Sequence, residues 1–269
     1  MKKSETGYFR YPTISGEKIV FVCEDDLWTV GRIGGVPRRL TSNLGEVTHP
    51  YLSPDGKWIA FIGRDEGQAE VYVMSAEGGS AQRLTFLGAN TIVVGWSRDG
   101  KSILFSSNVN QPFRRLLYIY SIGLNGGMPQ IVPVGPANNI YYSLTRGVVI
   151  GRNTADPARG KRYRGGTAGV LWIDKKGDGN FKKLLKLKSN FACPMWLGNK
   201  IYFISDHEGI GNIYSCNLDG EGIKRHTAHN EYYVRNATTD GKRIVYHSGA
   251  DIYLLEIVSN KSYKLDIDY

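Results

Sequence analysis

A unit of about 45 residues recurs six times along the chain, and this repeat restricts the possible folds more than any other feature. Each copy contains a short apolar segment of strand-forming residues, and the six segments contain Ile19, Ile59, Ile103, Val149, Ile201 and Ile244. Their spacings are 40, 44, 46, 52 and 43 residues. A period in this range is typical of the blades of a β-propeller.

Two further segments follow each apolar strand. The first usually ends on an aromatic residue, as in Asp26-Leu27-Trp28, Glu70-Val71-Tyr72, Leu171-Trp172, Asn212-Ile213-Tyr214 and Asp251-Ile252-Tyr253. The second is basic and apolar, as in Arg38-Arg39-Leu40-Thr41, Gln82-Arg83-Leu84-Thr85 and Lys183-Leu184-Leu185. Asp-Gly pairs precede three of the apolar strands, and this dipeptide between apolar runs is a strong hairpin signal because both residues tolerate positive φ.

These patterns predict an all-β chain that forms a six-bladed β-propeller with four antiparallel strands per blade. One four-stranded unit cannot bury both of its faces alone, whereas radial packing against neighbours covers them. A sandwich would not produce six copies of one motif. We expect a single domain over residues 1–269, with blades at approximately 8–43, 44–87, 88–134, 135–187, 188–229 and 230–269.

The places of the first and last strands within the repeat predict how the ring closes. The first inner strand is expected near Tyr11-Pro12-Thr13-Ile14, and the last outer strand from Tyr263 to Ile267. No spare strand remains at either end to complete the opposite blade. We therefore expect closure by packing of blade faces, without strand exchange, in a ring that opens more easily than one locked by exchanged strands.

Composition and charge narrow the functional classes. No stretch approaches 18 apolar residues and no apolar signal-peptide core follows Met1–Gly7, which predicts a cytoplasmic protein without a membrane partner. The net charge is +9, but the cations are mostly scattered over turns, which favours a solvated surface over a nucleic-acid partner. The three cysteines are far apart in the sequence and are expected to be reduced.

No catalytic residue, metal site or cofactor is predicted. The chain has no Gly-x-Ser-x-Gly elbow and no His-Glu-x-x-His motif. Asp174–Asn180 faintly resembles a calcium loop, but its ligand spacing is wrong and favours a polar turn. His226 and His229 are three residues apart with no third ligand nearby, which favours surface groups over metal ligands.

Ala155–Gly169 is the longest insertion and accounts for the 52-residue spacing. Long loops in compact domains are often functional, so a gate or docking surface is one interpretation and a surface hairpin is the other. If the loop is a gate or docking surface, the residues that form it are Arg159, Lys161, Arg162, Tyr163 and Arg164. One aromatic among four basic groups is a weak signal for nucleic-acid binding.

Longer segments of the chain resemble the N-terminal part of tricorn proteases, over residues 8 to about 267. The opening Tyr8-Phe9-Arg10-Tyr11-Pro12 and the run from Ile19 to Trp28 carry this resemblance. It continues in Gly151–Thr154, in Lys161–Gly169, and in Lys200–Asp206 with Gly211–Ser215. These runs extend beyond the generic propeller repeat, so the resemblance is specific.

The resemblance implies a role within a larger enzyme. Tricorn proteases are large cytoplasmic serine peptidases that shorten oligopeptides released by the proteasome or similar proteases. They have a six-bladed propeller, then a seven-bladed one, a PDZ-like domain and catalytic domains, and they assemble as hexamers. The family's catalytic residues lie beyond position 269, so this chain is expected to be a non-catalytic scaffold and a channel on the product side.

The family's six-bladed propeller also supplies basic residues that hold a peptide's C-terminal carboxylate. In the archaeal form an arginine pair lies in the linker entering the third blade, but here that linker, Phe86–Thr91, has no arginine. Arg114 and Arg115 lie nearby in the same blade and are the candidates, because guanidinium groups match carboxylates. In a strand only one of them would face a given site, and a solvated hairpin is the alternative.

Two other interpretations remain open from the sequence. One is a stand-alone propeller that binds a protein or peptide partner. The other is an enzyme with its own site on the propeller face, which the lack of a catalytic constellation disfavours.

Overall fold

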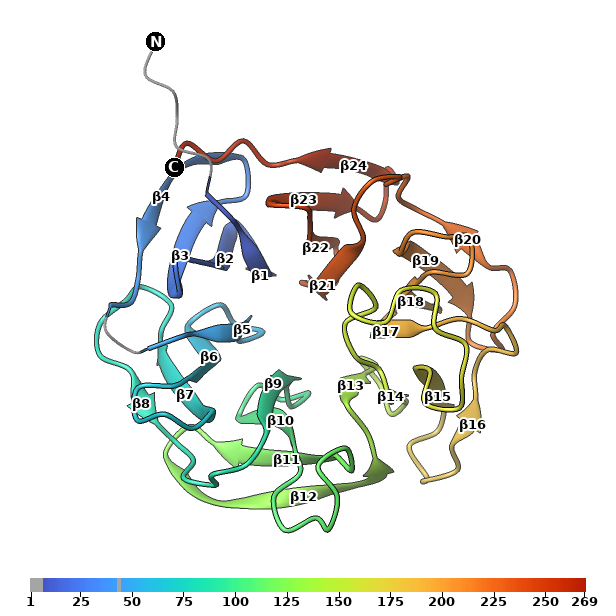
Figure 1. The fold of residues 1–269 in the computed structure, drawn as a ribbon, viewed down its shortest axis with the longest axis horizontal. Helices are drawn as coiled ribbons and strands as arrows, with labels where there is room; N and C mark the ends of the chain where they lie inside the picture. Colours follow the sequence, from blue (N-terminus) through green and yellow to red (C-terminus); the bar gives the residue numbers. More distant parts are fainter. Residues whose placement is uncertain (1–6, 43–44) are drawn as a thin grey trace.

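The computed structural model describes residues 7–42 and 45–269 and shows a ring of six four-stranded antiparallel sheets (Figure 1). In each sheet the strands are ordered as in the chain, with the first strand nearest the centre. Over the described residues there is no helix that could cross a membrane. The predicted six-bladed propeller is confirmed, whereas Met1–Thr6 and the expected blade boundary at residues 43–44 lie outside the described part.

The strand bounds follow the repeat. Blade 1 contains β1 (Arg10–Ser15), β2 (Lys18–Cys23), β3 (Asp26–Gly31) and β4 (Gly34–Arg39). Blade 2 contains β5 (Thr48–Leu52), β6 (Trp58–Gly63), β7 (Glu70–Ser75) and β8 (Gln82–Arg83). Blade 3 contains β9 (Thr91–Trp96), β10 (Ser102–Ser107), β11 (Tyr118–Gly123) and β12 (Gly126–Pro136).

The second half of the ring repeats this order. Blade 4 contains β13 (Asn139–Tyr142), β14 (Val148–Arg152), β15 (Val170–Asp174) and β16 (Lys182–Lys183). Blade 5 contains β17 (Phe191–Leu197), β18 (Lys200–Ser205), β19 (Asn212–Asn217) and β20 (Lys224–Arg225). Blade 6 contains β21 (Val234–Thr239), β22 (Arg243–Ser248), β23 (Asp251–Glu256) and β24 (Lys261–Lys264).

The hydrophobic core is divided into six layers, one between each pair of neighbouring blades. The layer between blades 1 and 2, for example, joins Val20 and Val22 of β2 to Ile59 and Phe61 of β6. The second strand of each blade is buried on both faces, which explains its near-continuous apolar sequence. The repeated sequence therefore determines both the strands of each blade and the apolar interface between neighbouring blades.

Prolines occur in the inner strands because these strands have a free edge toward the axis. Pro12, Pro50 and Pro194 each follow a residue in the left-handed conformation, with φ of 50°, 50° and 48°. The strand register shifts at all three places, as expected for β-bulges. Proline lacks an N–H donor, and an edge strand tolerates that loss.

Within residues 7–42 and 45–269 the ring closes mainly by face packing, as predicted, and each sheet consists of four consecutive strands. Ten buried residues of blades 6 and 1 form the closing layer, and burying a large apolar side chain contributes roughly 1.5–3 kcal/mol before entropy is counted. The expectation of an outer strand to Ile267 is wrong in one respect. β24 ends at Lys264, and Ile267 instead forms a parallel bridge to Gly35 of blade 1.

This C-terminal clasp, residues 266–269, adds a second link between the ends of the ring. The N–H of Gly35 donates to the carbonyl of Asp266 at 2.8 Å, and the N–H of Asp268 donates to the carbonyl of Gly35 at 3.1 Å. The Tyr269 ring packs edge-on against Phe9 and Trp28 at 5.7 and 5.0 Å between centroids. Two net hydrogen bonds contribute about 1–3 kcal/mol, which is small beside the closing apolar layer.

We expect Gly34→Ala to weaken ring closure. A Cβ at Gly34 would lie 2.1 Å from the carbonyl oxygen of Asp266 and would displace the clasp. Gly35→Ala is the matched control, because Gly35 also has a positive φ but a Cβ there meets nothing within 4 Å. Urea unfolding should show a loss of about 2–4 kcal/mol for Gly34→Ala and about 1–2 kcal/mol for Gly35→Ala. Equal losses would mean that the clasp does not stabilise the ring.

Candidate functional site

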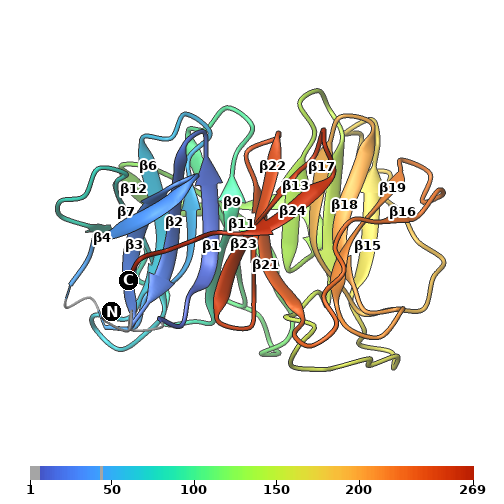
Figure 2. The same ribbon diagram turned by 90° about the horizontal axis from the view of Figure 1, so that it is seen from above.

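The innermost strands of all six blades enclose a central channel that consists of two cavities. One has a volume of about 480 Å³ and lies beside the turns between the first and second strands of the blades. The other has a volume of about 300 Å³ and lies beside the loops between the second and third strands. Figure 2 shows that these two sets of connections occupy opposite ends of the ring. We call the two cavities the turn-end chamber and the loop-end chamber.

The two chambers meet at a shared wall near the middle of the channel. Tyr51, Val94, Asn139, Cys193 and Thr238 line both of them. Three left-handed residues of the inner strands, Tyr11, His49 and Asn236, line only the loop-end chamber, whereas the left-handed Cys193 lines both. The β-bulges thus shape mainly the loop-end half of the channel, which a straight inner strand would not do.

The long insertion crosses the mouth of the loop-end chamber. It runs from Asn153 to Gly169 between β14 and β15, and Figure 1 shows it in yellow-green between β13 and β17 near the centre. Asp156 lies near its start and accepts a hydrogen bond from Nε of Arg235 on β21 at 2.7 Å. Both side chains are largely buried, and Arg159 lines the chamber beside them.

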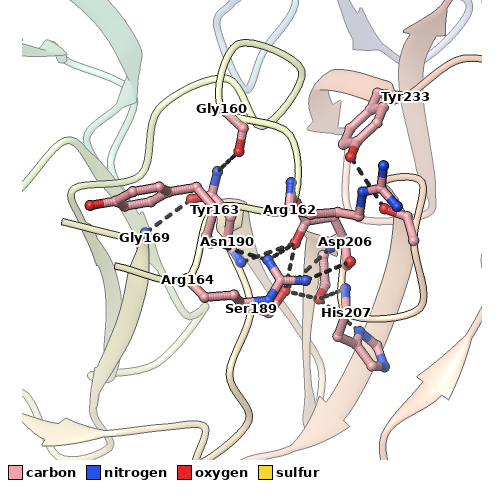
Figure 3. Close-up of polar contacts among 12 residues, drawn as sticks. Gly160, Arg162, Tyr163, Arg164, Gly169, Ser189, Asn190, Asp206, His207 and Tyr233 are labelled. Carbon is pink, nitrogen blue, oxygen red and sulfur yellow. Dashed lines mark hydrogen bonds and ion pairs between the residues drawn. The ribbon is translucent and has the colours of Figure 1, made fainter. Parts of the chain in front are cut away.

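The end of the insertion is fastened to blade 5 through Asp206, which is completely buried (Figure 3). The Asp206 carboxylate accepts hydrogen bonds from the Arg162 N–H at 2.7 Å and from Nη1 of Arg164 at 2.8 Å. It also accepts from Ser189 Oγ at 3.2 Å and from the Asn190 N–H at 3.1 Å. A buried carboxylate that accepts this many hydrogen bonds orders the segments that supply the donors.

The predicted gate residues therefore divide into different environments. Arg164 is bound to Asp206, and Arg159 lines the loop-end chamber. Lys161 and Arg162 are exposed and line a depression of about 1070 Å³ on the outer side of the insertion. Tyr163 is 44% exposed and its hydroxyl accepts a hydrogen bond from Thr167 within the insertion. The segment is an ordered loop and not a hairpin, because no strand pairing forms within it.

Arg114 and Arg115 lie in the loop between β10 and β11, at the same end of the ring as the insertion. Both are exposed, as is the neighbouring Phe113 at 70%. The N–H of Leu116 donates to the carbonyl of Phe113 at 3.0 Å, so the pair lies in a tight turn. The expectation that strand alternation would turn the two arginines to opposite faces does not apply, because β11 begins only at Tyr118.

Sequence reasoning missed the residues that hold the insertion in place. Asp206 follows an apolar strand, and its position in the family-like run Lys200–Asp206 was the only signal available. Asp156 and Arg235 are 79 residues apart, and nothing in the sequence pairs them. This contact forms only when the closed ring brings the insertion of blade 4 to the inner strand of blade 6.

Two histidines lie beside this ion pair without hydrogen-bond partners. Both ring nitrogens of His247 and Nδ1 of His49 are buried and unpartnered among the described residues. Burial, followed by the nearby Arg235 charge, lowers the pKa of His247 to about 3. Burial and then the Arg159 charge lower the pKa of His49 to about 4. Both imidazoles are therefore neutral at pH 7 in the folded protein.

The segment Asp174–Asn180, which faintly resembles a calcium loop in sequence, is held by hydrogen bonds within a turn. The Asp174 carboxylate accepts the N–H groups of Lys176, Gly177 and Gly179, which makes a capped polar turn as favoured. No group of three or more His, Cys, Asp or Glu residues that could hold a metal occurs within residues 7–42 and 45–269.

His226 and His229, for which the sequence favours surface groups over metal ligands, are partly buried and hydrogen-bonded. His226 bridges Ser215 on β19, 2.7 Å from its Nε2, and Asn260 of blade 6. His229 hydrogen-bonds the hydroxyl of Tyr246 at 3.1 Å. The Ser–His–Asn order resembles a hydrolase triad, but Ser215 is only 1% exposed, so a substrate cannot reach its hydroxyl. These contacts tie blade 5 to blade 6.

Comparison with known proteins identifies related chains over almost the whole length. Residues 6–261 match the family model described as the tricorn protease N-terminal beta propeller domain. A tricorn protease homolog of Saccharolobus solfataricus is 38% identical over 268 residues, which are 97% of this chain and 24% of that protein. The crystal structure of the tricorn protease superposes with a TM-score of 0.90 and 34% identity, over 98% of this chain and 26% of that one.

The chain thus spans about a quarter of the length of these relatives. A shorter protein of Sulfurisphaera tokodaii, named as a tricorn-like protease N-terminal subunit, is 34% identical over 172 residues. These are 62% of this chain and 86% of that protein.

We expect the neutral His247 to make stability fall at acid pH. Below pH 6.5 the imidazole takes up a proton in the unfolded chain but not in the fold, so stability is lost as the pH falls from 6.5 toward 4.5. One such group accounts for about 2–3 kcal/mol over this interval. His247→Leu should be less sensitive to pH by this amount in urea unfolding between pH 7.5 and 4.5. Parallel curves for the two proteins would contradict the assignment.

We also expect Arg164→Gln to loosen the insertion without unfolding the ring. It removes two hydrogen bonds to Asp206 but leaves the backbone donors of Arg162 and Asn190 in place. Trypsin should then cleave after Lys161 roughly tenfold faster, because a charge-assisted bond of about 1–2 kcal/mol no longer opposes local opening. Arg114→Gln removes an exposed arginine at the same end and should change nothing. An unchanged cleavage rate in Arg164→Gln would show that Asp206 does not hold the insertion.

Proposed function

Because this chain belongs to the tricorn protease N-terminal beta propeller domain family, we propose that residues 1–269 form one non-catalytic propeller domain of a tricorn-type serine peptidase. The domain acts as a scaffold and as a channel for oligopeptides. The observation that carries this proposal is the pair of chambers on the ring axis, lined by all six inner strands and sharing a wall. An extended peptide is narrow enough to follow such an axis, whereas a folded protein is not.

In this proposal the insertion Ala155–Gly169 is the gate of the channel. Its two fastenings support this role, because they act on different parts of it. Asp156 binds Arg235 beside the chamber, and Asp206 binds the segment around Arg162 and Arg164. Release of the first contact would uncover the loop-end chamber while the second keeps the loop on the ring. Lys161, Arg162 and Tyr163 remain exposed for docking.

A peptide's C-terminal carboxylate would bind to arginines at the same end of the channel. Arg114 and Arg115 are exposed in a turn, and no carboxylate of the described residues forms an ion pair with either of them. Their guanidinium groups are therefore free to bind a peptide carboxylate by paired hydrogen bonds. Arg159, an exposed residue that lines the loop-end chamber, would meet the same group at the chamber.

Because the relatives are much longer than this chain, their remaining domains are the candidate partners of this propeller. We infer contacts with the remaining tricorn domains, assembly into a hexamer and a cytoplasmic location. The Sulfurisphaera relative, which this chain largely covers, favours a second candidate in which the propeller is a separate subunit that binds a protein or peptide partner. The mass of the native polypeptide in an extract separates the two: several times 30.0 kDa supports the first, and 30.0 kDa the second.

We expect fluorescein-labelled tetraalanine to bind this chain roughly tenfold more tightly as the free acid than as the amide. The reason is a charge-assisted hydrogen bond to the carboxylate. The double variant Arg114→Gln/Arg115→Gln should lose this preference.

Stopped-flow fluorescence should also show faster association of the peptide with the Asp156→Asn variant, since that change breaks the contact with Arg235 over the chamber.

Arg146→Gln is the control for charge, because Arg146 is exposed but lies at the opposite end of the ring. It should leave the acid preference unchanged. Equal affinities for acid and amide would exclude a carboxylate site. Unchanged association with Asp156→Asn, at undiminished affinity, would exclude the gate.

A further inference from the structure

More than half of the net positive charge of this protein lies in one segment on the outside of blade 4, although most of the cations are elsewhere. Residues 175–188 contain six lysines and one aspartate, a net charge of +5, while the whole chain carries +9. The lysines are Lys175, Lys176, Lys182, Lys183, Lys186 and Lys188, and all six are exposed. Leu184 and Leu185 between them are buried in the layer against blade 5, so the backbone is anchored while the cations face solvent.

The repeat shows that this charge is not a general feature of outer strands. In four other blades a cation of the outer strand lies opposite an aromatic residue of the third strand, and an acid of the same blade neutralises it. The pairs are Arg39 with Asp26, Arg83 with Glu70, Arg225 with Glu208, and Lys264 with Asp251.

Blade 4 keeps the cation of this rule but lacks the acid. Lys183 lies opposite Trp172, as the repeat requires, but the third strand begins with Val170 where three of those blades have Asp26, Glu70 or Asp251. Of the six lysines, only Lys175 has a carboxylate partner within the described residues, Asp219 of blade 5. The acid that balances the charge elsewhere in the ring is therefore missing here.

A groove beside these lysines adds an unpaired arginine. It has a volume of about 510 Å³, lies between blades 3 and 4, and is lined by Arg152, Trp172, Phe181 and Lys182, among others. The guanidinium of Arg152 lies 4.7 Å from the centre of the Trp172 ring. Its Nε is buried and has no hydrogen-bond partner among the described residues. A guanidinium held over an aromatic ring has restricted freedom, and its remaining N–H groups suit a carboxylate.

We propose that this basic face of blade 4, formed by Arg152, Lys176, Lys182, Lys183, Lys186 and Lys188, binds an acidic, extended segment of a partner protein. The groove accommodates one carboxylate-bearing side chain against Arg152. The lysines that follow along the rim take further carboxylates, so the ligand is elongated rather than compact. Charge complementarity carries the choice of partner, since the acids that the repeat places in other blades must come here from outside.

The geometry disfavours a nucleic-acid strand. Strand binding relies on open aromatic faces on which bases stack, and the Trp172 face is already covered by Arg152.

The basic face of blade 4 is also independent of the proposed channel. It lies on the outer rim of the ring, whereas the channel lies on the axis, so either proposal can fail without the other (Figure 1).

Fluorescence anisotropy with this chain and a fluorescein-labelled (Glu-Val)₅ peptide tests the proposal. We expect binding that weakens as salt is added and no binding of (Lys-Val)₅. The double variant Lys182→Gln/Lys183→Gln should bind (Glu-Val)₅ roughly tenfold more weakly. Lys242→Gln/Lys261→Gln is the matched control, since it removes two exposed lysines from blade 6. This control should bind as the unchanged chain does.

A second variant, Arg152→Gln, tests the groove separately and should also weaken binding of (Glu-Val)₅. Equal losses in the two double variants would overturn the proposal, because they would reflect net charge alone. Tighter binding of a twelve-residue oligothymidylate than of (Glu-Val)₅ would overturn it in favour of nucleic acid. Failure of the unchanged chain to bind (Glu-Val)₅ at low salt would also overturn it, whatever the result for tetraalanine at the channel.

Discussion

The apolar packing between neighbouring blades is the interaction on which the rest of this structure depends. Six similar layers of buried side chains surround the axis, and none of the sheets could bury its faces without its neighbours. The closing layer between blades 6 and 1 is of the same kind as the other five. The C-terminal clasp is weaker and only adds to it. Because packing holds the ring, the inner and outer edges of the blades are free to differ in sequence.

The inner and outer edges of the blades differ from one blade to the next in their bulges and in their charged residues. At the inner edge, bulges at Tyr11, His49 and Cys193 shape the channel without disturbing the apolar layers. At the outer edge, blades 1, 2, 5 and 6 pair a cation of the outer strand with an acid, whereas Lys182 and Lys183 of blade 4 have no carboxylate partner among the described residues. The same blade carries the insertion over the channel mouth. Blade 4 therefore combines an outer strand without its acid and a long insertion between its second and third strands.

The general architecture could be predicted because its causes are local and periodic. Strand alternation, Asp-Gly turns and the return of one motif every 40 to 52 residues require no knowledge of distant contacts. The clasp at Gly35 and the ion pair between Asp156 and Arg235 could not be predicted in this way. Each joins segments from different blades, and a periodic pattern contains no information about which single residues meet across a ring.

The sequence by itself determined the number of blades, their strand content and the face-packed closure, since each follows from burying the faces of a repeated four-stranded unit. The tertiary structure alone decided the surroundings of the charged residues. It buried Asp206 under the insertion, left Arg114 and Arg115 in an exposed turn, and paired Asp156 with Arg235 of blade 6. The physical reason is that apolar burial depends on pattern, whereas the environment of a charge depends on the few groups that the fold brings within hydrogen-bonding distance.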